Sequence, residues 1–181
     1  MNIYFTSYGL DTRYSDYMDS YDGIIEVLKN KRVVIIPNAK LINQDRATSK
    51  VALDELEKNN IKASIIDIDT DKIDFNNIDA LYLSGGEPKN LMDSIIKACL
   101  FEKIKDFIDK GGIIIGQSAG AMIFAKDYLD TTTGELLIRH NGFDYSKKII
   151  VPHYDNWPEN VLAKIPKDIF AIHDHDKLIK Y

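Results

Sequence analysis

Short apolar runs alternate along most of the chain with segments whose apolar residues recur at helical spacing. Continuous apolar runs are typical of strands that are covered on both faces of a sheet. They predict strands over residues 2–8, 32–38, 62–69, 79–86 and 112–117. The helical patterns predict helices over residues 16–30, 44–59 and 88–100, and another from residue 101 to the glycine pair at 111 and 112. This alternation predicts an α/β fold, a three-layer sandwich with a mostly parallel central sheet.

The pattern changes after residue 130. Residues 134–140 and 147–155 are expected to form strands near loops, and residues 158–166 a short helix. The last segment, 169–181, predicts two strands joined by a turn. Repeats, low-complexity segments and domain linkers are absent from the sequence, and its length suits one domain, so we expect residues 1–181 to form a single domain.

Charge and hydropathy narrow the range of partners. The formal net charge is −5, and no basic stretch offers a run of phosphate contacts, so we do not expect nucleic acid as a partner. No apolar run reaches the ~18 residues that a membrane helix needs. The N-terminus lacks the basic start and long apolar segment of a signal peptide, which favours a cytoplasmic protein.

Two further observations concern cysteine and cofactors. The single cysteine, Cys99, lies in the apolar context IIKACLF, where we expect a small buried side chain. Neither a GxGxxG pattern after a strand nor a phosphate-binding loop occurs, so the sequence predicts no cofactor. The oligomeric state is not indicated by the sequence.

The segment GIIIGQSAGAMIF places Ser118 between an apolar strand and residues 119–129, which have a helical pattern. A sharp strand-to-helix turn exposes its central residue at the carboxyl edge of the sheet, and small neighbours such as Gly116, Ala119 and Gly120 permit it. The helix dipole and free N–H groups would favour negative charge there, and the Ala119 N–H would face an oxyanion. Ser118 is therefore a candidate nucleophile, although a serine at this position could also simply cap the helix.

A nucleophilic serine needs a base, usually histidine. His153 ends an apolar strand in IIVPHYDN and is expected at the same edge of the sheet, while His140 is the second candidate. The HDHD segment (173–176) could suggest a metal site, but a third ligand at recognised spacing is missing from the sequence. A polar turn between two strands is the preferred interpretation of that segment, and we expect no metal.

Gly85 and Gly86 end the strand in LYLSGGEPKNLM and precede a helix. Glycines at such a position allow close approach of the backbone to a ligand and could supply a second oxyanion donor. On these residues alone, a plain connection between strand and helix explains them equally well.

Together, SGGEPKNL, GQSAGAM, NGFD and VPHYDN, in this order and spacing, resemble the peptidase E and cyanophycinase-like serine peptidases. The resemblance extends from residue 2 to the end of the chain. It implies a class I glutamine amidotransferase-like α/β fold and hydrolysis of short peptides through an acyl-enzyme. Glutamine amidotransferase chemistry itself is disfavoured, because it uses a cysteine at the position of Ser118.

The resemblance also implies roles for individual residues. Ser118 would be the nucleophile and His153 the general base. Gly86 and Ala119 would donate hydrogen bonds to the oxyanion. The acidic member would be Asp174 in AIHDHDKL, with Glu135 as the alternative.

The implied substrates are short peptides, in particular dipeptides with N-terminal aspartate, as for peptidase E. Such a substrate needs a cation near the pocket, for which Arg139 or Arg46 could serve. Glu87 departs from the family pattern, which commonly has asparagine after the glycines, and would alter the charge preference. Glu87 and the early end of the chain at Tyr181 support an alternative function, a small-molecule-binding or regulatory protein with a degenerate peptidase site.

Overall fold

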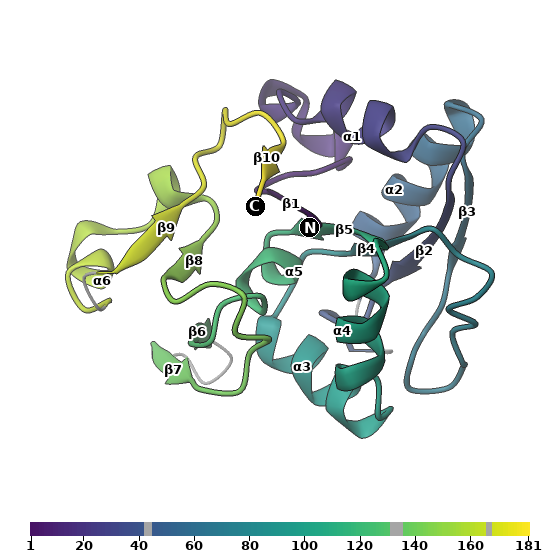
Figure 1. Ribbon diagram of the computed structural model, residues 1–181. Coiled ribbons are helices and arrows are strands. Elements are labelled where there is room, and N and C mark those ends of the chain that lie inside the picture. Colours follow the sequence, from purple (N-terminus) through teal and green to yellow (C-terminus); the bar gives the residue numbers. More distant parts are fainter. Residues whose placement is uncertain (42–44, 131–135, 166–167) are drawn as a thin grey trace.

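The computed structural model describes residues 1–41, 45–130, 136–165 and 168–181. Its centre is a six-stranded sheet with the strand order β10-β1-β5-β4-β2-β3 (Figure 1). The strands are β1 (Asn2–Thr6), β2 (Arg32–Ile36), β3 (Lys62–Ile65), β4 (Ala80–Leu83), β5 (Ile113–Gln117) and β10 (Ile179–Lys180). All neighbouring pairs are parallel except β1 with β10, which confirms the predicted mostly parallel sheet.

Helices cover both faces of this sheet. On one face lie α1 (Tyr21–Leu28) and α2 (Ala47–Lys58), and on the other α3 (Pro88–Lys97), α4 (Phe101–Asp109) and α5 (Ala119–Met122) (Figure 1). The packing of β4 explains why its sequence is continuously apolar. Ala80 and Tyr82 pack with the first helix layer, and Leu81 and Leu83 pack with the second. The architecture is therefore a three-layer α/β sandwich. Because helices cover both faces of the strand, its residues are apolar throughout and do not alternate with polar ones.

The C-terminal part forms two small sheets beside the central one (Figure 1). In the first, β6 (Tyr128–Asp130) pairs antiparallel with β7 (Leu137–Arg139), and in the second, β8 (Ile149–Val151) pairs parallel with β9 (Ile169–Ala171). The short helix α6 (Glu159–Leu162) lies between β8 and β9 in the chain, and 3₁₀ helices cover Thr12–Tyr17 and Tyr154–Asn156. Among the described residues, none of the helices combines the length and apolar character that crossing a bilayer requires.

Several elements differ from the sequence prediction. The helix expected from residue 16 begins only at Tyr21, and Thr12–Tyr17 forms a 3₁₀ helix before it. The Ser20 side chain between them is buried, and its hydroxyl lies 2.8 Å from the Thr6 hydroxyl. The strand expected to reach residue 69 ends at Ile65, after which Asp67 turns toward Asn38.

The helix expected over residues 119–129 is a single turn, Ala119–Met122, and this prediction was wrong beyond that turn. The carbonyl of Ile123 accepts the N–H of Phe143 at 2.8 Å, so a crossing segment replaces the next helical hydrogen bonds. Cys99 was also predicted incorrectly, because it is exposed just beyond α3 at a φ of 55°. Leu100 occupies the buried position instead.

Candidate active site

The carboxyl ends of the parallel strands β1, β4 and β5 meet at one edge of the central sheet. Ser7 follows β1, Gly85 and Gly86 follow β4, and Ser118 follows β5. A pocket of about 190 Å³ opens there, and these four residues and His153 contribute to its lining. Ligands of open α/β sheets bind at this edge, where loops from several strands converge.

Ser118 occupies a strained backbone conformation, with φ 50° and ψ −110°. A non-glycine residue in a sparsely populated region costs about 1–3 kcal/mol, so the surroundings must hold it. The Ser118 N–H donates to the Thr6 carbonyl at 2.9 Å, and the Ser118 carbonyl accepts the N–H of Ala121 at 2.8 Å. A Cβ at Gly116 would lie 2.7 Å from the Gly120 carbonyl oxygen, and one at Gly120 would lie 2.2 Å from the Leu83 carbonyl oxygen. The glycines are therefore required by close backbone packing around the turn.

His153 reaches Ser118 from the loop after β8. Its Nε2 lies 3.1 Å from the Ser118 Oγ. The His153 backbone has a φ of 53°, and its N–H donates to the Ser7 Oγ at 3.0 Å. Ser7 in turn donates to the Ile172 carbonyl at 3.2 Å. The ring of Tyr8 packs edge-on against the imidazole, with 4.5 Å between ring centroids. The ring of His153 is thus held from the backbone side and from one face.

Asp174 lies behind His153, in the turn between β9 and β10. Its Oδ1 is 3.3 Å from the His153 Nδ1, and its side chain is 4% exposed. The other carboxylate oxygen accepts a hydrogen bond from the Asn156 side-chain amide. The Asp174 N–H donates to Asp155 at 3.0 Å. The structure therefore brings Ser118, His153 and Asp174 together in one row, while the alternative acid, Glu135, lies outside the described residues.

Burial lowers the pKa of His153, and the neighbouring Asp174 offsets only part of that shift. The imidazole is therefore mostly neutral at neutral pH. With the Nδ1–H directed to the carboxylate, Nε2 is free to accept the proton of the Ser118 hydroxyl. This arrangement of hydroxyl, imidazole and carboxylate is the one that activates a serine for attack on a carbonyl.

The glycine loop after β4 lies directly against the serine. A Cβ at Gly85 would lie 3.4 Å from the Ser118 Cβ. Gly86 has a φ of 147°, and a Cβ there would lie 2.5 Å from the Ala39 carbonyl oxygen, so only glycine fits this position. Across the site, Ala119 opens α5, which is one turn long and therefore carries little macrodipole. Any stabilisation of negative charge must come from individual N–H groups rather than from the dipole predicted for a longer helix.

The two arginines suggested by the sequence are not brought to Ser118. The Arg139 Nη2 lies 2.7 Å from the carboxylate of Asp130, which is fully buried, and Arg139 lines a different pocket. Arg46 pairs with Asp67 at 2.6 Å and lines neither pocket at the serine. Each guanidinium group therefore forms an ion pair with a carboxylate of the protein and not with a group at Ser118.

Of two other candidate site residues, His140 lies away from Ser118 and Glu87 lies near it. His140 is exposed and lies 2.9 Å from Asp127, so it does not face the serine. Glu87 directly follows Gly86 and lines a second pocket, of about 100 Å³, which also borders Ser118. The HDHD segment forms a turn, and among the described residues no three His, Cys, Asp or Glu side chains are grouped to hold a metal ion.

Three contacts of the site were missed by the sequence reasoning. Ser7 and Tyr8 follow β1, and Asn156 lies within the VPHYDN segment. Ser7 and Tyr8 hold the backbone and ring of His153, and Asn156 holds the carboxylate of Asp174. The rule that selected the ends of the other strands applies equally to the end of β1, so it could have indicated Ser7 and Tyr8.

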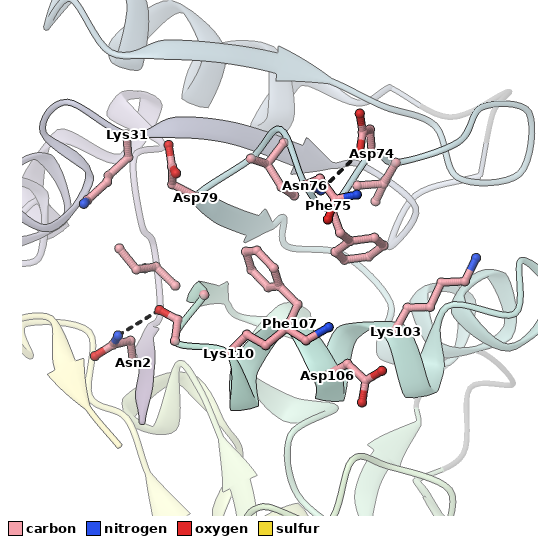
Figure 2. Close-up of a pocket in the computed structure, with 15 residues that line it drawn as sticks. Asn2, Lys31, Asp74, Phe75, Asn76, Asp79, Lys103, Asp106, Phe107 and Lys110 are labelled. Atoms are coloured by element: carbon pink, nitrogen blue, oxygen red, sulfur yellow. Dashed lines mark hydrogen bonds between the residues drawn. The ribbon is translucent and has the colours of Figure 1, made fainter.

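A further pocket, of about 630 Å³, lies at the opposite, amino end of the strands, where Asn2, Asp79 and Ile113 line it. Figure 2 shows Phe75 and Phe107 inside it, surrounded by lysine and aspartate side chains. It is larger than the pockets at Ser118, but its lining among the described residues contains no serine, cysteine or histidine. Chemistry rather than size therefore identifies the carboxyl edge as the candidate active site.

Comparison with known proteins identifies the family of the chain. The sequence pattern of peptidase family S51 matches residues 7–178. An uncharacterized peptidase of Pasteurella multocida (strain Pm70) is 28% identical over 165 residues, which cover 82% of this chain and 77% of that protein. An uncharacterized peptidase of Listeria innocua serovar 6a is 24% identical over 182 residues, which cover 94% and 85%.

Similarity to solved structures supports the fold. The crystal structure of a candidate peptidase E protein from Listeria monocytogenes EGD-e has a TM-score of 0.76 and 22% identity, covering 99% of this chain and 97% of that one. The fold agrees with the class I glutamine amidotransferase-like architecture implied by the resemblance in sequence. With the family match over most of its length, the chain belongs to peptidase family S51 and is a serine-type peptidase.

Proposed function

We propose that the protein is a serine exopeptidase that hydrolyses short peptides through an acyl-enzyme at Ser118. The observation that carries this proposal is the 3.1 Å contact between the Ser118 Oγ and the His153 Nε2, with the buried Asp174 on the other side of the imidazole. The row ends in a pocket that is open to a substrate. A cytoplasmic location is proposed with it, from the sequence alone.

In the first half-reaction, the Ser118 Oγ attacks the scissile carbonyl carbon while His153 takes the hydroxyl proton. Asp174 holds the imidazole in the required tautomer and stabilises the imidazolium. The backbone N–H groups of Gly86 and Ala119 donate to the oxyanion. The carbon–nitrogen bond then breaks, the imidazolium gives its proton to the leaving amine, and an ester remains on Ser118.

In the second half-reaction, His153 takes a proton from a water molecule, whose oxygen attacks the ester carbonyl. The intermediate breaks down, the proton returns to the Ser118 oxygen, and the peptide fragment leaves as a carboxylic acid. Atoms balance, since one water is consumed for each peptide bond hydrolysed.

The dimensions of the site favour short substrates. The two pockets that border Ser118 have volumes of about 190 and 100 Å³, which are small beside typical ligand pockets of about 300–1,000 Å³. Each is suited to a single residue rather than to an extended chain. We therefore propose that dipeptides and tripeptides are the substrates, including the Asp-X dipeptides that the family resemblance suggests.

The test is turnover of a panel of dipeptides and tripeptides by the wild type and by Ser118→Ala, with products identified by mass spectrometry. The account predicts release of single residues by the wild type and a loss of at least ~10³ in kcat/KM in the variant. Equal rates would rule out an acyl-enzyme at Ser118. Binding of peptides by the wild type without turnover would favour the degenerate binding protein instead.

A further inference from the structure

Two pockets of different character meet at Ser118. Both are lined by Gly86, Ser118 and His153, so both adjoin the reacting hydroxyl. We call the larger one the polar pocket, which adds Tyr8, Tyr14, Lys40 and Thr48. We call the smaller one the apolar pocket, which adds Glu87, Met122, Leu129 and Trp157. A peptide bond placed at Ser118 would direct its two residues into different pockets.

The apolar pocket is built from fixed side chains. Leu129 is fully buried and Met122 is 6% exposed. The indole N–H of Trp157 donates to the Pro152 carbonyl at 3.0 Å, which fixes the ring. An apolar substrate side chain is stabilised when it buries its surface against such a lining.

The described lining of the apolar pocket contains one carboxylate. Glu87 lines it, and no lysine or arginine does so among the described residues. An aspartate side chain in this pocket would be desolvated beside a like charge, which is unfavourable. A substrate ammonium group would instead be attracted to the Glu87 carboxylate.

The polar pocket has the opposite balance. Lys40 is the one lysine or arginine among the described residues that line either pocket. Its backbone is anchored, because the Lys40 carbonyl accepts two hydrogen bonds from Arg46, at 3.2 and 3.1 Å. The acidic residue of this pocket, Asp11, is already neutralised by both nitrogens of Arg13, at 2.7 and 2.6 Å. The positive charge of Lys40 therefore remains available to a substrate carboxylate.

We infer that the site selects peptides with a free carboxylate and an apolar N-terminal residue. The N-terminal side chain occupies the apolar pocket with its ammonium group toward Glu87, and the C-terminal carboxylate of a dipeptide lies toward Lys40. This inference rests on the proposed function, because it assigns substrate groups to pockets around the same serine. It differs from a preference for N-terminal aspartate.

The test measures kcat/KM for Leu-Ala, Asp-Ala and Leu-Ala amide with the wild type, Lys40→Met and Glu87→Gln. The wild type should prefer Leu-Ala to Asp-Ala by at least about tenfold, a ratio within reach of a hydrophobic pocket. It should also prefer Leu-Ala to its amide by about tenfold, the effect of one charge-assisted contact. Lys40→Met should lower the rate for Leu-Ala to that for the amide and leave the amide unaffected. Glu87→Gln should narrow the ratio of Leu-Ala to Asp-Ala.

Two controls keep the outcome clear. Lys29→Met removes an exposed lysine outside both pockets and should leave all three rates unchanged. Lys40→Gln, which keeps a polar side chain, repeats the test if Lys40→Met is not folded by circular dichroism.

Faster hydrolysis of Asp-Ala than of Leu-Ala would overturn the assignment of the apolar pocket. An equal effect of Lys40→Met on the acid and the amide would overturn the role of Lys40. In both cases hydrolysis that depends on Ser118 would still support the peptidase. Hydrolysis of no dipeptide above the level of Ser118→Ala would overturn the proposed function itself, and this inference with it.

Discussion

Two histidine–aspartate pairs lie in neighbouring turns of this molecule and differ sharply in their surroundings. In the first pair, 3.3 Å separates His153 from Asp174, and the side chains are 27% and 4% exposed. In the second, 2.8 Å separates His173 from Asp155, and the side chains are 50% and 49% exposed. The pKa of His153 is lowered by burial, whereas hydrogen bonding to Asp155 raises the pKa of His173.

The comparison shows that burial, rather than a short contact with a carboxylate, makes a histidine suitable as a base. His173 has the closer partner but stays protonated to a higher pH, so its ring is less available to accept a proton. His153 has the longer contact, yet its ring is mostly neutral at neutral pH and faces the Ser118 hydroxyl at 3.1 Å. The same pair of residue types therefore gives a neutral histidine beside Ser118 and a more basic, exposed histidine in the neighbouring turn.

Replacing each histidine by alanine should give the largest contrast. We expect His153→Ala to lower kcat/KM for a dipeptide by at least ~10³, because it removes the proposed general base. His173→Ala removes an exposed ion pair with Asp155 and a ring contact with Tyr154, and it should leave the rate nearly unchanged because exposed ion pairs contribute little. Steady-state kinetics on both variants check this, and equal losses would contradict the assignment of His153.

Replacing each aspartate by asparagine should give the next contrast. Asp174→Asn disturbs the tautomer and removes the charge that stabilises the imidazolium, so we expect a loss of about 10²–10⁴ in kcat. Asp155→Asn keeps an oxygen that can accept the Asp174 N–H, and we expect a loss below about tenfold. If Asp155→Asn proved the more damaging change, the carboxylate of Asp174 would not be the third member.

The two histidines should also titrate apart. Nuclear magnetic resonance should show the pKa of His153 below its ordinary value of about 6.5 and that of His173 above it, with each signal assigned from its alanine variant. Activity that needs neutral His153 should then persist below pH ~6.5 and be lost as the pH falls through the lowered pKa. Because Asp174 raises the pKa of His153, Asp174→Asn should shift this acid limb to lower pH. A shift to higher pH would contradict the coupling.

We expect the smallest effect on activity from replacing Tyr8, whose ring lies beside His153. Tyr8 packs edge-on against His153, and the ring of Tyr17 stacks on Tyr8 with 4.6 Å between centroids. Tyr8→Leu should lose an aromatic contact worth about 0.5–1.5 kcal/mol and lower kcat modestly, while Tyr8→Phe keeps the ring and should be milder. The measurement is kcat for both variants, and a larger loss in Tyr8→Phe would point to the hydroxyl instead of the ring.

Much of the fold could be predicted from the sequence because strands buried on both faces have continuous apolar runs. The position of Ser118 followed from the rule that side chains after parallel strands converge at one edge. His153 was expected at the same edge, but it follows β8 of a separate two-stranded sheet and reaches Ser118 from beside the central sheet. The same rule applied to β1 and β2 would have indicated Tyr8 and Lys40, but the order of strands in the sheet depends on long-range pairing that local patterns do not contain.

The errors arose where tertiary contacts override a local pattern. Residues 123–129 have apolar spacing that suits a helix, yet contacts with residues 143–146 take up the carbonyls that a helix would need. Arg139 was an attractive cation for a substrate, but the buried carboxylate of Asp130 requires it. Whether Arg139 binds a substrate carboxylate or the carboxylate of Asp130 depends on tertiary contacts that the local sequence does not contain.

Reaction with a fluorophosphonate, followed by mapping of the modified peptide, tests the central claim most directly, since it requires an activated serine and no choice of substrate. The account predicts stoichiometric modification of Ser118 in the wild type and reaction at least ~10² slower in His153→Ala. Absence of reaction in the folded wild type, modification of a different serine, or equal rates in the two proteins would contradict it.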